Sequence, residues 1–247
     1  MLAFPELVAH RGHPHHLPEN SLSALRSALE LGARWVEVDV QLSHDGTPHL
    51  YHDRDMQRLS GREGAVHELS DAELAATPLR EAARLGEDSP TERIPTLRAA
   101  AELCATFEGV TLFVEVKRVA VEAFGVERVL AAVCEAMQAS GQPWVLISFS
   151  LELLEACRRD PELPIGLILE SWAQQFEPEA EALGAEYIFC NVDRWPAEGP
   201  IPDRSFVLYE VTDPDRALAL HARGAQWIET FQLEEMQQAF RDRGWQA

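Results

Sequence analysis

Eight short apolar segments alternate along the chain with longer segments rich in Ala, Leu, Glu and Arg. The apolar segments are LVAH (7–10), WVEVDV (35–40), TLFVEV (111–116), WVLISF (144–149), IGLILE (165–170), EYIFC (186–190), SFVLYEV (205–211) and QWIET (226–230). This pattern predicts β-strands that alternate with α-helices, as in the βα units of a parallel sheet. Eight such units favour an α/β fold of the (β/α)₈ or TIM-barrel type, because closing the barrel removes the exposed edges of an open sheet.

Helical segments are predicted between most of these strands. The clearest are residues 21–32, 96–107, 127–140 and 215–224. Asn20 or Ser21 is expected to cap the first of them, and Gly32 to end it. An open doubly wound sheet is the alternative architecture. However, neither a GxGxxG motif nor a P-loop follows the first strand, where a nucleotide-binding fold usually carries its phosphate loop.

One domain is expected to span residues 1–247, since barrels of this type commonly reach about 250 residues without splitting. Two features interrupt the regular alternation. The Asp45–Gly46 turn predicts that residues 48–52 return beside the second strand as a hairpin. Residues 54–93 are polar and too numerous for an ordinary loop. They are predicted to form a small insertion after the hairpin, either on the catalytic face or as a partly ordered excursion.

The charge of the chain excludes some partners. With 41 acidic and 21 basic residues the formal net charge is −20, which opposes general binding to nucleic acid or to an anionic membrane surface. No segment approaches the roughly 18 consecutive apolar residues of a membrane span, and the first strand begins too near Met1 to leave room for an export signal. Four cysteines without a CxxC pair are interpreted as free thiols. A cytoplasmic protein is expected, and a homo-oligomer is compatible with the sequence.

Charged residues gather at the predicted carboxyl ends of the strands, where barrels of this type carry their active sites. Glu37 and Asp39 are two residues apart and point to one face of their strand. Glu115 belongs to the next barrel strand. Three converging carboxylates suit a hard divalent cation, Mg²⁺ or Ca²⁺, with Mn²⁺ as a further candidate. The alternative is a salt-bridged interior in which Lys117 or Arg11 neutralises the acids.

Two histidines stand at predicted strand ends. His10 and His52 could each carry a proton near neutral pH, one toward a leaving oxygen and the other from an attacking one. Arg11 offers a planar fork that suits a pair of phosphate oxygens. Taken singly, each histidine is also compatible with a structural role.

These residues belong to an ordered set of motifs. AHRG is followed by PEN and Ser21, EVDVQLSHDG, HD at residues 52–53, IPTL at 94–97 and FVEVK. In this order the set resembles the glycerophosphodiester phosphodiesterase family, from about Val8 to Lys117, with weaker continuation through ISFS, LILESW and YEVTDPD. The resemblance implies a (β/α)₈ barrel with a small insertion after the HD strand. It also implies hydrolysis of a small-molecule glycerophosphodiester to glycerol 3-phosphate and an alcohol.

The resemblance further implies roles for individual positions. Residues 37, 39 and 115 match the family's metal-binding carboxylates, and residues 10 and 52 its acid/base histidine pair. Arg11 matches a phosphate-contacting arginine, and Lys117 a lysine that balances charge near the phosphate. Glu19, of PEN, matches an acid near the site that serves as a ligand or an orienting partner. The resemblance suggests attack by the glycerol 2-hydroxyl, followed by opening of a cyclic phosphate by water.

Three further histidines and two glutamates near the motifs are not assigned to the chemistry. His13, His15 and His16 lie in the gap between HRG and PEN and are interpreted as solvated loop residues lining the mouth, in preference to a second metal site. Glu210 and Glu229 depart from the family pattern. They either add negative charge facing an alcohol or amine head group or turn outward into helix-side salt bridges, and the second is favoured.

Two other functions fit parts of the sequence. A phospholipase-D-like enzyme acting on lysophospholipids would need an apolar surface for an acyl chain. Trp172, Phe176 and Trp195 could supply one, although aromatic residues at such positions more often pack the barrel rim. A non-catalytic anion-binding barrel is the remaining alternative, and the complete set of histidines and carboxylates argues against it.

Overall fold

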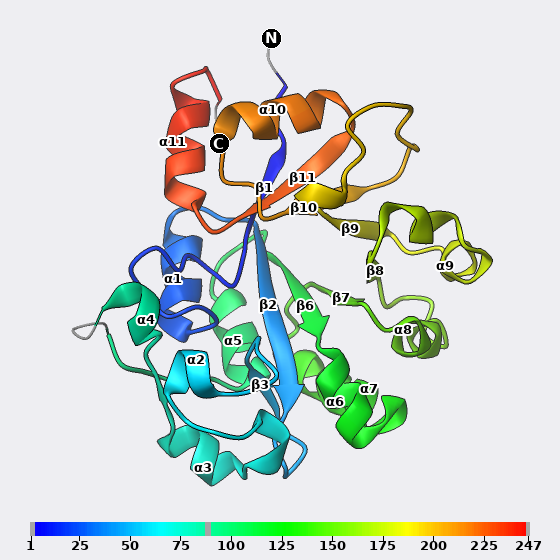
Figure 1. The fold of residues 1–247 in the computed structure, drawn as a ribbon. Helices are drawn as coiled ribbons and strands as arrows, with labels where there is room; N and C mark the ends of the chain where they lie inside the picture. The colour runs from blue at the N-terminus through cyan, green and yellow to red at the C-terminus, as the bar shows by residue number, and fades with distance from the viewer. Residues whose placement is uncertain (1–2, 87–89, 246–247) are drawn as a thin grey trace.

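The structure is a computed structural model that describes residues 3–86 and 90–245 (Figure 1). Eight parallel strands form a closed barrel, because β1 (Glu6–Ala9) pairs with β2 (Trp35–Leu42) on one side and with β11 (Ala225–Thr230) on the other. Between β2 and β11 the order is β6 (Thr111–Val116), β7 (Trp144–Ser148), β8 (Ile165–Ile168), β9 (Tyr187–Asn191) and β10 (Phe206–Tyr209). The predicted (β/α)₈ barrel is therefore confirmed, and an open sheet is excluded.

Helices follow most of the strands and cover the outside of the barrel. They are α1 (Leu22–Glu30), α5 (Leu97–Cys104), α6 (Arg118–Phe124), α7 (Val126–Gln138), α8 (Leu151–Cys157), α9 (Pro178–Leu183), α10 (Pro214–Ala222) and α11 (Leu233–Arg241). Ser21 caps α1 by accepting a hydrogen bond from the Ala24 amide, which stabilises the exposed N–H groups of the first turn. Asn20, the other candidate cap, is therefore available for a different contact.

Side chains of each strand alternate between the helical layer and the barrel interior. On β2, Val36, Val38 and Val40 join the core beneath the helices, whereas Glu37 and Asp39 are buried inside the barrel. Part of the interior is filled by a separate apolar cluster that includes Phe113. This period-two arrangement, which the sequence predicted, places the charged residues of β2 inside the closed barrel.

The amino-terminal end of the barrel is closed by aromatic rings. Trp35 stacks on Phe113 with ring centroids 5.3 Å apart, and Tyr187 and Trp227 pack edge-on against them. Gly166 lies among these packed strands, where a Cβ atom would come within 2.8 Å of the Ile147 side chain. The charged residues are thus confined to the opposite end of the barrel.

The predicted hairpin is present, since β3 (Pro48–Leu50) runs antiparallel to β2. The segment after it contains α2 (Gln57–Ser60), η1 (Val66–Glu68), α3 (Asp71–Ala76), β4 (Pro78–Leu79), α4 (Ala82–Leu85) and β5 (Glu92–Arg93). Figure 1 shows these elements beside α1 and the carboxyl end of β2. A small apolar core holds them together: Tyr51, Met56, Leu59, Val66, Leu69, Leu74, Leu79 and Ile94. Much of this polar segment therefore has regular structure.

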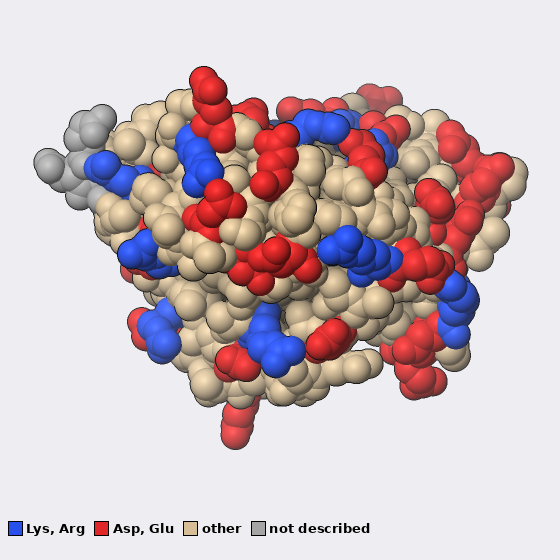
Figure 2. Space-filling view, turned by 90° about the horizontal axis from the view of Figure 1, so that it is seen from below, with Lys and Arg blue, Asp and Glu red and all other residues tan. Residues whose placement is uncertain are grey.

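The surface carries charges of both signs. In Figure 2 acidic and basic side chains are interspersed over the face shown, and acidic ones gather toward the end at which α8 and α9 lie in Figure 1. Within the described residues, no helix combines the length and the apolar character that crossing a membrane requires.

Candidate active site

Three carboxylates converge at the carboxyl ends of two neighbouring strands. Glu37 and Asp39 come from β2 and Glu115 from β6, with Asp39 directly beside Glu115 in the strand register. One oxygen of each lies within 4.8 Å of the others, and Glu37 and Asp39 are at most 1% exposed. The predicted convergence of these side chains is confirmed.

Two cations partly neutralise this cluster. The Lys117 Nζ atom lies 3.2 Å from Asp39 and donates a 2.6 Å hydrogen bond to Glu115. Arg11 Nε lies 3.0 Å from Asp39. Although burial raises the pKa of Asp39, Lys117 and Arg11 outweigh that effect and hold it well below its usual range. The salt-bridged interior considered as an alternative is therefore present for Asp39, which is ionised between two cations.

Glu37 lies in a different environment. Burial raises its pKa well above the usual value, and the negative charges of Asp39, Glu229 and Glu115 raise it further. Its Oε2 atom accepts a hydrogen bond from the Arg11 backbone amide, whereas Oε1 is buried and has no partner among the described residues. A buried oxygen without a partner amid several carboxylates fits a hard divalent cation held by Glu37, Asp39 and Glu115.

His10 directly follows β1, the strand that pairs with β2 in the barrel. Its Nε2 atom is 3.1 Å from Glu229 on β11 and 3.9 Å from Glu37, and its ring stacks on Phe231 with centroids 4.0 Å apart. Burial lowers the pKa of His10 well below its usual value, and the nearby Arg11 charge lowers it further. A neutral imidazole in this position is able to accept a proton.

Glu229 lies inside the barrel, contrary to the prediction from the sequence. The prediction that it turns outward into a helix-side salt bridge is wrong, because it points into the barrel, is 2% exposed and contacts His10. Burial raises its pKa well above the usual value, and the charge of Glu115 adds to the rise. Glu210 is exposed at the mouth, where it accepts a hydrogen bond from Asn191. It forms no helix-side salt bridge in the described structure.

His52 faces the same cavity from the end of the hairpin. Its Nδ1 atom lies 2.7 Å from Asp53, which leaves Nε2 free to meet a substrate. Asp53 is in turn held by two hydrogen bonds from Arg58 of α2. Burial raises the pKa of Asp53, but hydrogen bonds from His52 and Arg58 lower it below its usual value. A carboxylate that fixes the orientation of an imidazole is a common support for proton transfer.

Arg11 is held firmly in the structure. Its backbone has a positive φ of 56°, and its guanidinium donates a 2.8 Å hydrogen bond to Glu19 and lies over the Phe231 ring. Gly12 follows with φ 82°, and a Cβ atom there would come within 2.7 Å of the Ala24 backbone. Glycine is therefore required at position 12, where the left-handed turn comes into close contact with α1.

Several residues of the site were missed by the sequence analysis. Asn20 donates a 2.8 Å hydrogen bond to Asp39 and accepts one from its backbone amide. Arg58 bonds both Asp53 and Glu19, so it connects the insertion to the barrel. The PEN and HD motifs already contained Asn20 and Asp53. In contrast, Arg58 lies in a helix of four residues, which is too short to produce a periodic signal.

Two adjoining cavities lead to these groups. The inner cavity, of about 100 Å³, is lined by His10, Arg11, Glu37, His52, Glu115, Lys117, Ile147, Phe149, Ile168, Phe189, Tyr209, Glu210 and Glu229. The outer cavity, of about 560 Å³, is lined partly by the insertion, through residues that include Arg58, Glu81 and Arg84. Arg11, His52 and Glu210 line both cavities. A substrate reaching the carboxylates would pass the insertion.

The three remaining histidines of the HRG–PEN gap differ from one another. His15 and His16 are exposed, as predicted, and His15 lines the outer cavity. His13 is 7% exposed, and its Nδ1 atom lies 3.0 Å from the Ser27 hydroxyl. The prediction of a solvated loop residue is therefore wrong for His13, because the turn at Gly12 directs its ring onto α1.

A barrel with acidic metal-ligand candidates and a histidine pair at its carboxyl end is typical of a metal-assisted hydrolase. The family model for the "Glycerophosphoryl diester phosphodiesterase family" matches residues 10–235. The glycerophosphodiester phosphodiesterase of Caldanaerobacter subterraneus is 31% identical over 73% of this chain and 75% of its own. The chain belongs to the glycerophosphoryl diester phosphodiesterase family.

A solved structure agrees with this assignment. A phosphodiesterase from Oleispira antarctica, in complex with the product sn-glycerol-3-phosphate, superposes with a TM-score of 0.84 at 26% identity, covering 96% of this chain and 97% of the other. The human glycerophosphodiester phosphodiesterase 1 is 38% identical over 110 residues, and the match spans only 33% of that protein.

Proposed function

We propose that the protein hydrolyses glycerophosphodiesters to glycerol 3-phosphate and an alcohol, with a divalent metal held by Glu37, Asp39 and Glu115. The observation that carries this proposal is the convergence of those carboxylates beside two strand-end histidines and two cations. The product bound to the Oleispira relative supports the substrate class. Mg²⁺ or Ca²⁺, with Mn²⁺ as a further candidate, would neutralise phosphate charge and lower the pKa of an attacking hydroxyl when bound.

The cationic residues would bind the phosphate. A phosphodiester carries one negative charge, which repels nucleophiles unless it is neutralised. Arg11 and Lys117 both line the inner cavity and are already fixed by hydrogen bonds, so they lose little freedom when a phosphate enters. Glu19 would orient Arg11, since it accepts the 2.8 Å hydrogen bond from that guanidinium.

His10 and His52 would move the protons. One of them accepts the proton of the attacking glycerol 2-hydroxyl, and the other donates a proton to the departing alcohol oxygen. Water then opens the resulting cyclic phosphate. Asp53 keeps the Nε2 atom of His52 toward the cavity, and Phe231 and Glu229 fix the ring of His10.

The insertion would belong to the same functional domain. We propose that residues 1–247 act as one unit in which the insertion at 54–93 completes the substrate entrance. Arg58 supports this proposal, since it bonds Asp53 next to one catalytic histidine and Glu19 beneath Arg11. The free thiols Cys104, Cys134, Cys157 and Cys190 suit a reducing compartment, as expected for a cytoplasmic enzyme.

The lysophospholipid alternative has less support. Trp172 and Trp195 pack against Phe206, and none of the three lines either cavity. Phe176 is exposed. These aromatic residues therefore offer no acyl-chain surface at the entrance. The complete charged set likewise disfavours a non-catalytic barrel.

The test is to incubate the purified protein with glycerophosphocholine and glycerophosphoethanolamine in the presence of Mg²⁺ or Ca²⁺. We expect release of glycerol 3-phosphate together with choline or ethanolamine. A parallel reaction with lysophosphatidylcholine distinguishes the alternative, because choline release from that lipid alone would exclude the proposed substrate class. The absence of release from all three would favour the non-catalytic barrel. Size-exclusion chromatography of the same sample tests whether the protein forms a homo-oligomer.

A further inference from the structure

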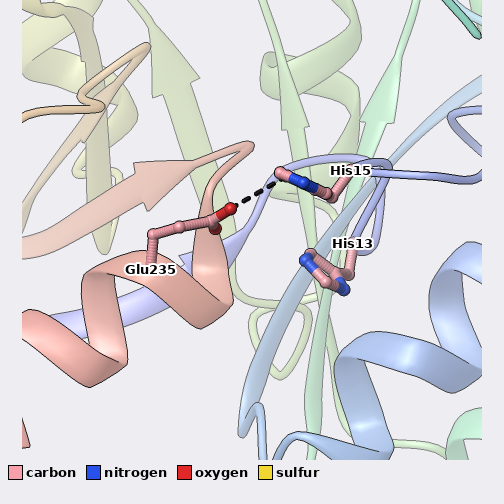
Figure 3. A group of neighbouring side chains, drawn as sticks. All are labelled: His13, His15 and Glu235. Atoms are coloured by element: carbon pink, nitrogen blue, oxygen red, sulfur yellow. Dashed lines mark ion pairs between the residues drawn. The ribbon is translucent and has the colours of Figure 1, made fainter.

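A second group of metal-ligating side chains lies outside the catalytic carboxylates. His13 and His15 from the loop after β1 meet Glu235 from the first turn of α11, with one potential ligand atom of each within 4.8 Å of the others. Figure 3 shows both imidazoles on the side of the loop that faces α11, with an ion pair joining His15 to Glu235. None of the three belongs to the proposed catalytic set.

His13 has one ring nitrogen near a hydrogen-bond partner and the other available for a metal. Its ring is buried, and its Nδ1 atom lies 3.0 Å from the Ser27 hydroxyl. The Nε2 atom is also buried and has no hydrogen-bond partner among the described residues. When Nδ1 carries the proton and donates it to Ser27, the lone pair of Nε2 is available. A metal-ligating histidine commonly has such a second partner, which fixes its tautomer and orientation.

The loop that carries the two histidines is held in place. The His13 backbone amide donates a 2.9 Å hydrogen bond to the Ala24 carbonyl of α1. Farther along the loop, Arg84 of the insertion donates hydrogen bonds to the carbonyls of Pro14 and Leu17, at 2.6 and 2.9 Å. A ligand fixed before binding needs little ordering when the metal arrives.

His15 and Glu235 can complete a coordination sphere. Their side chains are 39% and 46% exposed, and they already form a 2.9 Å ion pair. Ligand atoms in a tetrahedral zinc site lie about 3.3–3.6 Å apart, given bond lengths of about 2.0–2.2 Å. The present separations extend from 2.9 Å for the His15–Glu235 ion pair to at most 4.8 Å within the group. Rotamer adjustments of these two exposed side chains can bring the separations into that range, while His13 stays fixed.

We propose that His13, His15 and Glu235 form a Zn²⁺ site distinct from the catalytic centre, with water as the fourth ligand. Two imidazoles and one carboxylate match zinc, whereas Mg²⁺ and Ca²⁺ prefer sites made only of oxygen atoms. The ion would clamp the loop after β1 to α11. Because His15 and Gln232 also line the outer cavity, the clamp would fix one side of the substrate entrance.

The test counts zinc bound to the full chain in excess Mg²⁺. Wild type is compared with His15→Ala and Glu235→Gln, which alter exposed ligands and spare the buried core. His44→Ala is the matched control, since His44 is an exposed histidine outside the cluster. We expect wild type and His44→Ala to bind one more Zn²⁺ per chain than the two ligand variants. Zn²⁺ should raise the Tm of wild type and His44→Ala through this site.

Ser27→Ala tests the orientation of His13 separately. Losing this second partner is expected to weaken the Zn²⁺ affinity about 10–100-fold without changing the number of sites. Zinc binding by Glu235→Gln with the stoichiometry and affinity of wild type would overturn the proposal. An equal loss in His44→Ala would overturn it as well, because binding would then be non-specific, and so would the absence of bound zinc in wild type.

Discussion

The inner cavity has two contrasting walls. Strands β1, β2, β6 and β11 contribute histidine, carboxylate and lysine side chains, whereas β7, β8 and β9 contribute Ile147, Ile168 and Phe189. His10, Glu37, Asp39 and Glu229 on the charged wall are buried, and burial together with neighbouring charges shifts their pKa values. The apolar wall contains only carbon surface at these positions.

The contrast explains how one barrel can hold reactive charges without losing its stability. Buried carboxylates are costly unless cations or hydrogen bonds offset them, and the charged wall supplies Arg11, Lys117 and Asn20 for that purpose. The apolar wall excludes water and so strengthens the electrostatic contacts opposite it. We therefore expect changes on the charged wall to affect chemistry strongly and changes on the apolar wall to affect packing modestly.

The largest effect is expected from Asp39→Asn on the charged wall. Asp39 contacts both Arg11 and Lys117 and is fully buried. Its replacement takes one carboxylate from each of these buried cations, which then keep only Glu19 and Glu115 as ion-pair partners among these contacts. We expect glycerophosphodiester turnover to fall at least about 10³-fold and the free energy of unfolding to drop by about 3–5 kcal/mol. Turnover assays and urea denaturation measure the two effects. A variant with unchanged stability would show that the two cations do not depend on Asp39.

His52→Ala is expected to separate chemistry from stability. The His52 side chain is 32% exposed, so its removal should leave urea denaturation nearly unchanged. Loss of one proton-transfer group should lower kcat by about 10²–10⁴-fold. His16→Ala, an exposed histidine that lines neither cavity, is the matched control and should retain normal kcat. A normal kcat in His52→Ala would exclude His52 from the chemistry.

Glu229→Gln tests how the buried Glu229 carboxyl makes the free energy of unfolding depend on pH. A buried carboxyl with a raised pKa stabilises the fold fully below its unfolded pKa, near 4.3, and this contribution is lost as the pH rises through the folded pKa. Removing the titrating group should therefore raise the free energy of unfolding of the metal-free protein at pH 7 and flatten its decline above pH 4.3. Each pKa unit corresponds to about 1.4 kcal/mol. A lower stability of the variant at pH 7 would contradict this account.

Ile168→Val on the apolar wall is expected to have the smallest effect. It removes one buried methylene group, which should cost about 0.5–1.5 kcal/mol of stability. Since Ile168 carries no charge toward the substrate, kcat should change less than about threefold. Thermal unfolding and turnover of the purified variant measure both. A loss of kcat as large as that of His52→Ala would mean that the apolar wall also takes part in the chemistry.

The strands of the barrel and the two acids of β2 were predictable because their patterns are local. Alternating valines and acids on β2 indicate the two faces of the strand from sequence alone. Glu229 was mispredicted for a related reason. Its strand carries Trp227 and Ile228 side by side, so apolar residues lie on both faces and the period-two pattern does not identify the inner one.

Contacts made by irregular segments could not be predicted. The burial of His13 depends on a left-handed turn at Arg11 and Gly12 that directs the loop onto α1. Arg58 meets Glu19 across 39 residues of sequence, and this pairing depends on how the insertion folds around its own apolar core. Such long-range contacts leave no periodic signal in a single sequence.

The most direct test of the central claim is a metal titration of wild type and Glu37→Gln. Glu37 keeps a buried oxygen without a partner among the described residues, and the account assigns that oxygen to the metal. Chelation should abolish glycerol 3-phosphate release by wild type, and Mg²⁺ or Ca²⁺ should restore it. Glu37→Gln should need at least about tenfold more metal for half of its activity. Release that persists after chelation, or equal metal requirements for the two proteins, would contradict the account.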